Sequence, residues 1–198
     1  MSFRIEEKLY IKPEHLLDFK AYLSKNLSQK LYHPRKIKSL YFDNINLNMY
    51  SDSIEGLVPR KKIRVRNYPN EKDKEFYFEI KNSSVEGRFK KRNIIKKSEF
   101  ENLKTQGYFD NQYGSCFPNI YVEYDREYLM VDDIRISIDT NLLYKDFRTQ
   151  VEKQDSKIII ELKTSIKKNL DELMHDFPMQ RIRFSKYCFA IENLYHQN

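Results

Sequence analysis

The segment RKKIRVRNY, residues 60–68, decides how the rest of the chain is interpreted. If it forms a β-strand, its alternation places four cations and Tyr68 on one face, and apolar side chains on the other. The four cations are Arg60, Lys62, Arg64 and Arg66. Like charges in a row repel one another, and an anion that faces them offsets this repulsion. For one strand alone, a solvated outer face is the favoured interpretation, and for residues 60–62 a solvated strand end remains an equal alternative.

Length and charge limit the classes of protein to consider. The chain has 198 residues, of which 40% are hydrophobic and 33% are charged, with a net charge of +7 and a pI near 9.1. This length predicts one domain over residues 1–198 with a sizeable core. The basic balance favours an anionic partner such as nucleic acid, nucleotide, polyphosphate or a membrane surface, and does not choose among them.

Several classes of site are disfavoured by what the chain lacks. Cys116 and Cys188 lie far apart, which indicates buried thiols in a reducing compartment rather than a disulfide framework. The four histidines are scattered without the spacing of metal ligands. The chain contains no apolar run for a membrane span and no apolar leader, so we expect a cytoplasmic protein without a membrane segment.

The alternation of residues 60–68 returns in other segments, so we expect about eight strands. The other seven are residues 3–11, 37–44, 75–81, 87–95, 119–129, 133–142 and 157–163. Between them, helical patterns begin at Pro13, with an apolar stripe that runs to Leu31, and after a capping box formed by Ser98 and Glu101. A short helical turn is expected at residues 47–50, and two closing helices at residues 170–177 and 185–195.

The fold class predicted from these segments is α+β. Antiparallel strands in this number usually close into a barrel or stack as a sandwich, which removes exposed edges. The charged faces mix arginine, lysine and glutamate, whereas the apolar faces are rich enough to need covering by helices. This favours a closed eight-stranded antiparallel β-barrel with a charged lumen and helices packed outside. Alternation does not say which face is inside, so an ordinary barrel with an apolar interior stays open at this point.

Nine short motifs, in order, resemble the polyphosphate-polymerase (VTC) domain over about residues 3 to 195. They are R-x-E-x-K at 4–8, S-L-Y-F-D-N at 39–44, R-K-K-I-R-V-R at 60–66, F-E-I-K at 78–81, G-R-F-K-K-R at 87–92, Y-D-R at 124–126, R-I-S-I-D-T at 135–140, I-E-L-K at 160–163 and F-S-K-Y at 184–187. The VTC domain is grouped with the triphosphate tunnel metalloenzymes, beside the CYTH adenylate cyclases and triphosphatases. The resemblance implies a closed eight-stranded tunnel lined by cations and acids.

One position separates this chain from the CYTH branch. CYTH proteins begin with E-x-E-x-K, and Arg4 stands here where the first glutamate would be. A metal-binding carboxylate is thereby replaced by a cation, which favours the VTC branch over a hydrolase. Eukaryotic VTC proteins also carry an SPX domain and membrane helices, and neither is expected in this chain.

The resemblance implies transfer of the γ-phosphate of ATP to inorganic polyphosphate, with pyrophosphate as a possible primer and no nucleic acid. Such phosphoryl transfer needs positioning and charge stabilisation, and Mn²⁺ or Mg²⁺ as cofactor. The acceptor phosphate is already ionised, so no strong general base is required. The catalytic residues implied are Arg64, Arg66, Lys81, Arg126, Arg135 and Lys186. Phosphate binding is expected of Lys8, Lys62, Arg88, Lys90, Arg92, Lys163 and Ser185, and metal binding of Glu161, assisted by Glu6, Glu79 and Glu123.

Plainer roles compete with these assignments. Tyrosines at 41, 77 and 121 are more often core or wall residues than ligand contacts. Asp139 is either a metal helper or the partner of Arg135, and the sequence favours the partner. Ser185 is expected to cap the last helix, whereas Lys186 in its first turn opposes the helix dipole, which favours phosphate binding there.

Two other function classes remain open besides the polymerase. A triphosphatase would use the same tunnel to release phosphate from tripolyphosphate, and the arginine at position 4 argues against it. A non-catalytic module would bind nucleic acid or polyphosphate without turnover. The glutamates on the same strand faces would repel a nucleic-acid backbone, which argues against the nucleic acid.

Overall fold

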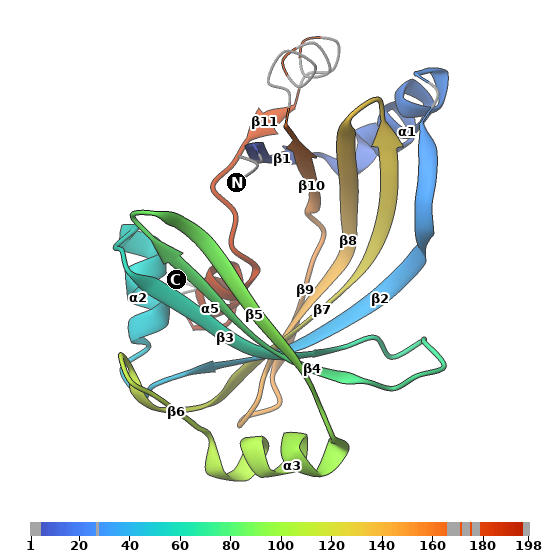
Figure 1. Cartoon of the computed structure of the whole chain (residues 1–198). Coiled ribbons are helices and arrows are strands. Elements are labelled where there is room, and N and C mark those ends of the chain that lie inside the picture. The colour runs from blue at the N-terminus through green and yellow to red at the C-terminus, as the bar shows by residue number, and fades with distance from the viewer. Residues whose placement is uncertain (1–4, 27, 166–170, 172–174, 176–178, 196–198) are drawn as a thin grey trace. The chain divides into compact units, whose positions relative to one another are not determined.

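The computed structural model describes residues 5–26, 28–165, 171, 175 and 179–195 (Figure 1). Its chain divides into two compact units. The first unit consists of Met1–Lys36, Tyr124–Leu142 and Asp155–Phe184, and the second consists of Ile37–Glu123, Leu143–Gln154 and Ser185–Asn198. The prediction of a single domain over residues 1–198 stays a prediction.

All eight predicted strands are present, together with three short ones. The strands are β1 (Ile5–Ile11), β2 (Gln29–Asp43), β3 (Arg60–Asn67), β4 (Phe76–Ser84), β5 (Gly87–Ile95), β6 (Tyr108–Asp110), β7 (Gly114–Val131), β8 (Ile134–Asp146), β9 (Glu152–Asp155), β10 (Ile158–Thr164) and β11 (Gln180–Arg181). Their hydrogen-bonded order is β11-β1-β10-β8-β7-β2-β3-β4-β5, with β6 on β7 and β9 on β8. Together with four α-helices among the described residues, the sheet confirms the α+β class.

The two ends of this order decide how far the barrel prediction is confirmed. Within the described part of the chain, β11 pairs only with β1 and β5 pairs only with β4. The sheet is therefore not closed by hydrogen bonds, and the closed eight-stranded barrel is not confirmed.

The core of the first unit is built from the apolar faces of β1, β8 and β10 and from helix α1 (Leu16–Lys25). The register places Leu9 opposite Ile160, and both side chains are fully buried. Phe19 and Leu23 of α1 are fully buried in the same cluster. Since side chains alternate along a strand, Glu6 and Lys8 of β1 and Glu161 and Lys163 of β10 lie on the faces turned away from this core. Glu7 is the exception, because it shares the strand face of Leu9.

The predicted extension of the first helix to Leu31 is wrong. A 3₁₀ turn at Pro13–His15 leads into α1, which ends at Lys25, and Leu31 already belongs to β2. Pro34 explains the difference, because proline disfavours helical geometry for the residue before it and cannot donate the helical hydrogen bond. The apolar spacing of Leu23 and Leu31 fits a helix and does not by itself exclude a strand.

The second unit is covered on its apolar side by helices. Leu40, Ile63 and Val65 of β2 and β3 form its core with Met49 of α2 (Asn48–Glu55), and Phe100 of α3 (Lys97–Gln106) packs against them. Helix α2 packs on both β3 and α5 (Lys186–Tyr195), as Figure 1 shows. Apolar faces under helices agree with the arrangement predicted from the charge pattern.

The four other helix predictions have different outcomes. The turn expected at residues 47–50 is a longer helix, α2. The predicted capping box of Ser98 and Glu101 is wrong, because α3 begins at Lys97 and Glu99 accepts the Lys96 N–H at 2.7 Å. The closing helix at residues 185–195 is confirmed by α5, whereas the helix predicted at 170–177 lies outside the continuous part of the chain that the structure describes.

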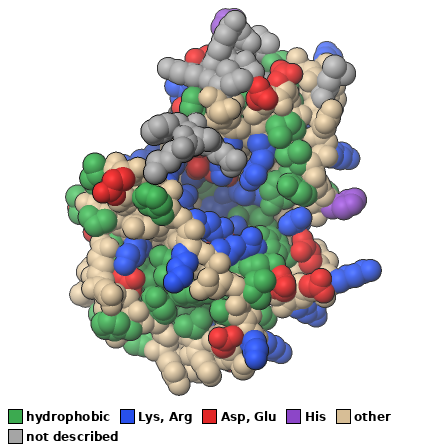
Figure 2. Space-filling model, viewed as in Figure 1, with side chains coloured by type: hydrophobic (Ala, Val, Ile, Leu, Met, Phe, Trp, Pro, Cys, Tyr) green, Lys and Arg blue, Asp and Glu red, His purple; other side chains and the backbone are tan. Residues whose placement is uncertain are grey.

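Charged side chains also occupy the outer surface. On the face drawn in Figure 2, basic side chains lie among acidic and apolar ones. None of the helices in the described residues is long and apolar enough to cross a membrane.

Candidate functional site: two charged clusters

The first unit contains a cluster of acids and cations that we call the Glu161 cluster: Glu6, Lys8, Arg126, Asp139, Glu161 and Lys163. Strand register creates it, because Lys8 lies opposite Glu161 and Glu6 lies opposite Lys163 in the β1–β10 pair. Glu161 approaches Lys163 at 3.2 Å and Arg126 at 3.7 Å. Lys8 donates to the Phe184 carbonyl at 2.8 Å, which ties β1 to the end of this unit.

Glu161 is held in its charged form by these neighbours. Burial raises the pKa of its carboxyl group, but Arg126 and Lys163 outweigh burial and bring the pKa well below its usual range. Glu6 lies beside Glu161, since Lys163 is 3.7 Å from the Glu6 carboxylate and 3.2 Å from that of Glu161. Two carboxyl groups this close are a common arrangement for a divalent cation.

Asp139 is an ion-pair partner, as the sequence favoured, and the cation that it holds is Arg126. The Arg126 guanidinium donates to its two oxygens at 2.5 and 2.7 Å, in a bidentate pair. Arg126 is thus oriented by Asp139 on one side and approaches Glu161 on the other. Arg135 lies opposite Lys163 in the β8–β10 pair.

The second unit contains a separate group that we call the Arg64 cluster: Tyr41, Lys62, Arg64, Arg66, Glu79, Lys90, Arg92, Ser185 and Lys186. Glu79 is its negative centre and is 1% exposed. Arg64 contacts Glu79 through Nε at 2.7 Å and through Nη2 at 2.6 Å. Lys90 forms a close ion pair with the other carboxylate oxygen, and Arg92 lies 3.5 Å from it.

These cations determine the charge of Glu79. Burial raises the pKa of Glu79, but Arg64, Arg66 and Lys90 outweigh burial and lower the pKa to about 2. The cluster therefore holds one permanent anion among several cations, and its net charge stays positive. Arg66 is nearly buried and donates to Ser39 at 3.2 Å, so its guanidinium is also held in place.

The start of α5 joins this cluster. Ser185 caps the helix, since its hydroxyl accepts the Cys188 N–H at 3.4 Å. The same hydroxyl accepts a hydrogen bond of 2.9 Å from Lys62. Burial, together with the nearby Lys81 and Arg60, lowers the pKa of Lys62 despite opposing effects of Cys188 and Tyr41. A cation, a capping hydroxyl and a helix N-terminus thus meet at one point, a combination that suits an anion.

Four further predicted site residues are not members of the two clusters as defined above. Lys81 and Arg88 are exposed on β4 and β5, with Lys81 opposite both Lys62 and Lys90. Glu123 pairs with Lys38 at 2.5 Å. Since Lys38 shares a strand face with the core residue Leu40, this pair lies on the face of β2 opposite to Tyr41. The fourth residue, Arg135 on β8, lies opposite Lys163 of the Glu161 cluster.

The alternative of a solvated strand end for residues 60–62 does not hold. Arg60 donates to the carbonyls of Gly56 and Leu57 at 3.1 and 2.7 Å. Lys61 forms an ion pair of 2.9 Å with the buried Asp110, on the opposite strand face from Lys62. Each of the three side chains therefore has an internal partner.

The carboxylates present decide whether a divalent metal fits either cluster. Within the described ranges, no group of three or more His, Cys, Asp and Glu side chains could hold a metal. The Glu6 and Glu161 pair fits Mg²⁺ or Mn²⁺, because such ions are often held by one or two carboxylates and completed by substrate phosphates and water. Glu79 fits less well, since three cations already surround it.

Sequence reasoning missed two residues of the second unit. Tyr41 was assigned to the wall, yet its hydroxyl accepts a hydrogen bond of 2.9 Å from Arg64. Asp43, two residues later, accepts from the Tyr187 hydroxyl at 2.7 Å and from the Met49 N–H at 3.0 Å. Their shared signal was the motif at 39–44, in which Tyr41 falls on the same strand face as Ser39.

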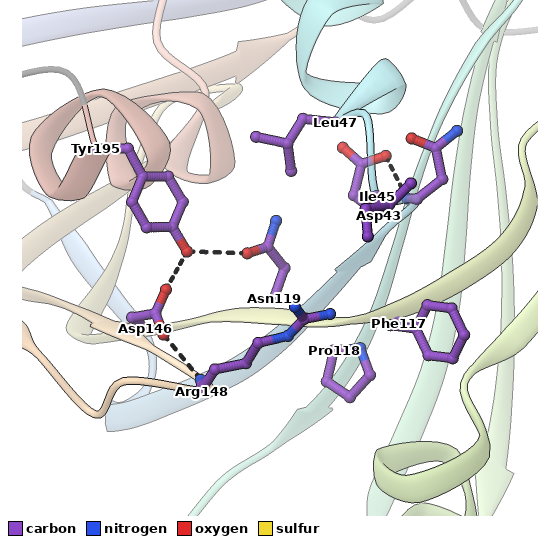
Figure 3. Close-up of a pocket in the computed structure, with 10 residues that line it drawn as sticks. Asp43, Ile45, Leu47, Phe117, Pro118, Asn119, Asp146, Arg148 and Tyr195 are labelled. Atoms are coloured by element: carbon purple, nitrogen blue, oxygen red, sulfur yellow. Dashed lines mark hydrogen bonds between the residues drawn. The ribbon is translucent and has the colours of Figure 1, made fainter.

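A cavity of about 170 Å³ in the second unit contains none of the predicted site residues (Figure 3). Ile45, Leu47, Phe117 and Pro118 form its apolar wall. Its polar side chains largely satisfy one another, since Tyr195 donates to Asp146 and lies 3.2 Å from the Asn119 side-chain oxygen. Charged groups suited to phosphate gather in the two clusters rather than here.

Comparison with protein families gives one match along nearly the whole chain. The VTC domain model matches residues 3–195. Among curated proteins, none matches the sequence.

Solved structures with the same fold share little sequence with this chain. A candidate adenylate cyclase from Bacillus halodurans has a TM-score of 0.65 at 13% identity, covering 98% of this chain and 100% of its own. A candidate adenylyl cyclase from Hippeastrum, described as having a dominant triphosphatase activity, has a TM-score of 0.62 at 13% identity, with 96% of both chains covered. A protein from Pyrococcus horikoshii has a TM-score of 0.60 at 15% identity, covering 96% of this chain and 99% of its own. At such identities the likeness establishes the fold alone.

Proposed function

Because the chain belongs to the VTC domain family, we propose that it is a polyphosphate polymerase, which transfers the γ-phosphate of ATP to a growing polyphosphate chain. The observation that carries the proposal is the composition of the Glu161 cluster. It combines two carboxyl groups in contact with a guanidinium and two ammonium groups on neighbouring strands. Phosphoryl transfer needs this pairing of a metal site with phosphate-binding cations.

Mn²⁺ or Mg²⁺ would be held by Glu161 and Glu6, and when bound it would neutralise charge on phosphate oxygens. Asp139 has a different role, since it orients Arg126 through two hydrogen bonds. An oriented guanidinium grips phosphate oxygens in a bidentate manner, whereas Lys8 and Lys163 supply point charges. Glu79 and Glu123 are not part of the metal site that we propose.

The Arg64 cluster is proposed to bind further phosphates of the nucleotide or of the polyphosphate. Arg64 and Arg66 are positioned by Glu79 and Ser39, and Lys62, Ser185 and Lys186 gather at the start of α5. Lys81, Arg88, Lys90, Arg92 and Arg135 remain proposed phosphate contacts. The acceptor oxygen is already ionised, so the reaction needs no strong base, which agrees with two clusters built without histidine.

The proposal is tested by incubating the protein with ATP and Mn²⁺, with a trace of pyrophosphate as primer, and resolving the products on a polyphosphate gel. We expect a ladder of lengthening chains with an equal yield of ADP. Glu161→Gln should lower the rate by about 100-fold or more, since it removes a metal-binding charge. Glu127→Gln is the matched control, because Glu127 belongs to the same unit and pairs with Lys20 outside the cluster.

A triphosphatase is the second candidate, and the Hippeastrum neighbour with its dominant triphosphatase activity is the observation in its favour. It predicts free phosphate from tripolyphosphate, lost in Glu161→Gln, and no chains from ATP. If neither product forms with any divalent metal, both enzyme proposals fail. Binding of tripolyphosphate that Glu161→Gln leaves intact would then point to a non-catalytic polyphosphate module.

A further inference from the structure

Tyr41 contributes to the Arg64 cluster a hydroxyl that faces an arginine and is not required by the proposed reaction. It lies on β2 directly opposite Arg64 on β3, and it is 4% exposed. Leu40 and Phe42 on either side of it point into the core, so Tyr41 occupies the charged face of the strand. A core tyrosine would instead share the face of those two residues.

The surroundings fix both the ring and the oxygen of Tyr41. The ring stacks on Tyr187 of α5, with centroids 5.1 Å apart and an interplanar angle of 17°. The oxygen accepts from Nη1 of Arg64 at 2.9 Å. Tyr187 is itself held, since its hydroxyl donates to Asp43 at 2.7 Å. The phenol oxygen is therefore confined beside the guanidinium and has little freedom to turn away.

Several charged groups act on this hydroxyl from the elements around it. Burial raises the pKa of Tyr41, but Arg64 and Arg66 of β3 and Lys186 of α5 outweigh burial and lower the pKa to about 8. Lys62 of β3 is a further cation close enough to interact with it. The negative charge of the cluster, Glu79 of β4, acts on the far side of Arg64.

Arg64 is thereby shared between two acceptors. Its Nε and Nη2 face Glu79, and its Nη1 faces Tyr41. When Tyr41 is neutral, a phosphate oxygen can approach the guanidinium without meeting a second negative charge. When Tyr41 loses its proton, the phenolate offsets the charge of the guanidinium beside it, and it repels an external anion.

We infer that Tyr41 is part of the anion-binding site of the Arg64 cluster, and that binding of a polyphosphate anion there is coupled to retention of the proton on its hydroxyl. The coupling is reciprocal: the anion favours the protonated phenol, and the phenolate weakens the anion. The inference rests on the proposed function only in taking a polyphosphate as the ligand of this cluster. It does not depend on chain growth.

The chain is well suited to a direct measurement, because it has 15 tyrosines and no tryptophan to mask the absorbance of tyrosinate. Among the other tyrosines, the pKa is raised for Tyr50, Tyr77, Tyr113, Tyr121, Tyr187 and Tyr195, each with burial among its causes. An ultraviolet titration of the wild type should therefore show one tyrosine ionising near pH 8, ahead of the rest. Tyr41→Phe should lack this step, and Tyr195→Phe should keep it.

The ligand arm uses inorganic tripolyphosphate on the whole chain, without nucleotide or metal. Saturating tripolyphosphate should move the early step of the wild type upward by about one pH unit or more. In calorimetry, the ratio of the wild-type Kd to the Tyr41→Phe Kd should rise about tenfold or more between about pH 7 and 9.5. Taking the ratio cancels the effect of tripolyphosphate protonation on Kd, because both proteins bind the same ligand at each pH.

The outcomes separate this inference from the polymerase proposal. The inference is overturned if no tyrosine of the wild type ionises before the others, or if tripolyphosphate leaves the early step where it was. Both readings come from the wild type, so they stand even if Tyr41→Phe folds poorly. A shifted step without polymer formation from ATP supports the inference and overturns the polymerase. Polymer formation without any shift does the reverse.

Discussion

At the scale of single residues, Glu79 shows how a buried acid can serve a cluster of cations. Removing it leaves Arg64 and Lys90 near each other without their common anion. We expect Glu79→Gln to lower the free energy of unfolding by about 3 kcal/mol, because breaking a buried ion pair leaves charge uncompensated. The same change should tighten tripolyphosphate binding, since the ligand then supplies the missing negative charge.

The measurement is thermal unfolding of both proteins with and without tripolyphosphate. The rise in Tm caused by the ligand should be larger for Glu79→Gln than for the wild type. Glu101→Gln is the control, because Glu101 pairs with Lys104 on the surface of α3 and such pairs contribute little. A smaller ligand effect in Glu79→Gln would contradict the role given to Glu79.

The acid sensitivity of the protein is a second prediction for the same residue. The pKa of Glu79 is about 2 in the folded chain, against 4.5 as its ordinary value. The ionised Glu79 therefore contributes about 3 kcal/mol to the free energy of unfolding above about pH 4.5. This contribution is lost as the pH falls toward 2. Urea unfolding at pH 7 and pH 3 should show a smaller loss of stability in Glu79→Gln than in the wild type. An equal loss in both proteins would exclude this residue as a source of the acid sensitivity.

At the scale of elements, Asp43 connects the end of β2 to two helices. The residue before α2, Leu47, has φ 56° and no side chain able to cap the helix. Asp43 fills that role, since its carboxylate accepts the N–H groups of Met49 and Tyr50 at 3.0 Å. The Tyr187 hydroxyl of α5 binds the same carboxylate. One side chain thus fixes the start of α2 and the helix that carries Ser185 and Lys186.

We expect Asp43→Ala to lower the free energy of unfolding by about 3 kcal/mol, through the lost cap and the unsatisfied buried donors. The free energy of unfolding of Asp43→Asn should lie between those of the wild type and Asp43→Ala, because the asparagine amide oxygen still accepts a hydrogen bond. Hydrogen exchange should quicken at the amides of Met49 and Tyr50 in both variants. Asp52→Asn is the control, since Asp52 lies in α2 and its carboxylate accepts from the Tyr113 hydroxyl at 2.6 Å. Unchanged exchange at Met49 would rule out the capping role.

The same scale shows what the sequence could and could not predict. Alternation located all eight main strands, because a side-chain period of two is a direct consequence of strand geometry. It misplaced Leu31, where an apolar residue fits a helix and a strand equally well. It also could not exclude Glu123 from the metal candidates, because the face that a strand presents depends on what packs against it.

Pairings across strands were harder to predict than the strands themselves. Asp139 was matched with Arg135, on its own strand, whereas its partner is Arg126 on the neighbouring one. Register decides such contacts, and register depends on the whole sheet. Tyr41 was missed for a similar reason, since its contact with Arg64 exists only once β2 and β3 are aligned.

At the scale of the whole molecule, the net charge of +7 raises the question of whether anions are attracted generally or bound by the clusters. Two adjacent lysines of β5 can separate these effects. Lys90 forms an ion pair with Glu79, whereas Lys91 is exposed and lies opposite Ile80, whose side chain packs against the core of the second unit. Lys90→Gln and Lys91→Gln each lower the net charge by one. Any effect that depends on net charge alone is therefore the same in both variants.

If the Arg64 cluster binds the anion, Lys90→Gln should weaken tripolyphosphate binding several-fold, and Lys91→Gln should change it little. General attraction would weaken both equally, since it depends on the summed charge. The two origins of binding also differ in salt dependence, because NaCl between about 0.01 and 1 M screens attraction to the summed charge more than close ion pairs within a binding site. Calorimetry of both variants across that range therefore discriminates between the two origins. Equal losses that vanish together at high salt would assign the binding to net charge and remove the case for a dedicated anion site in the second unit.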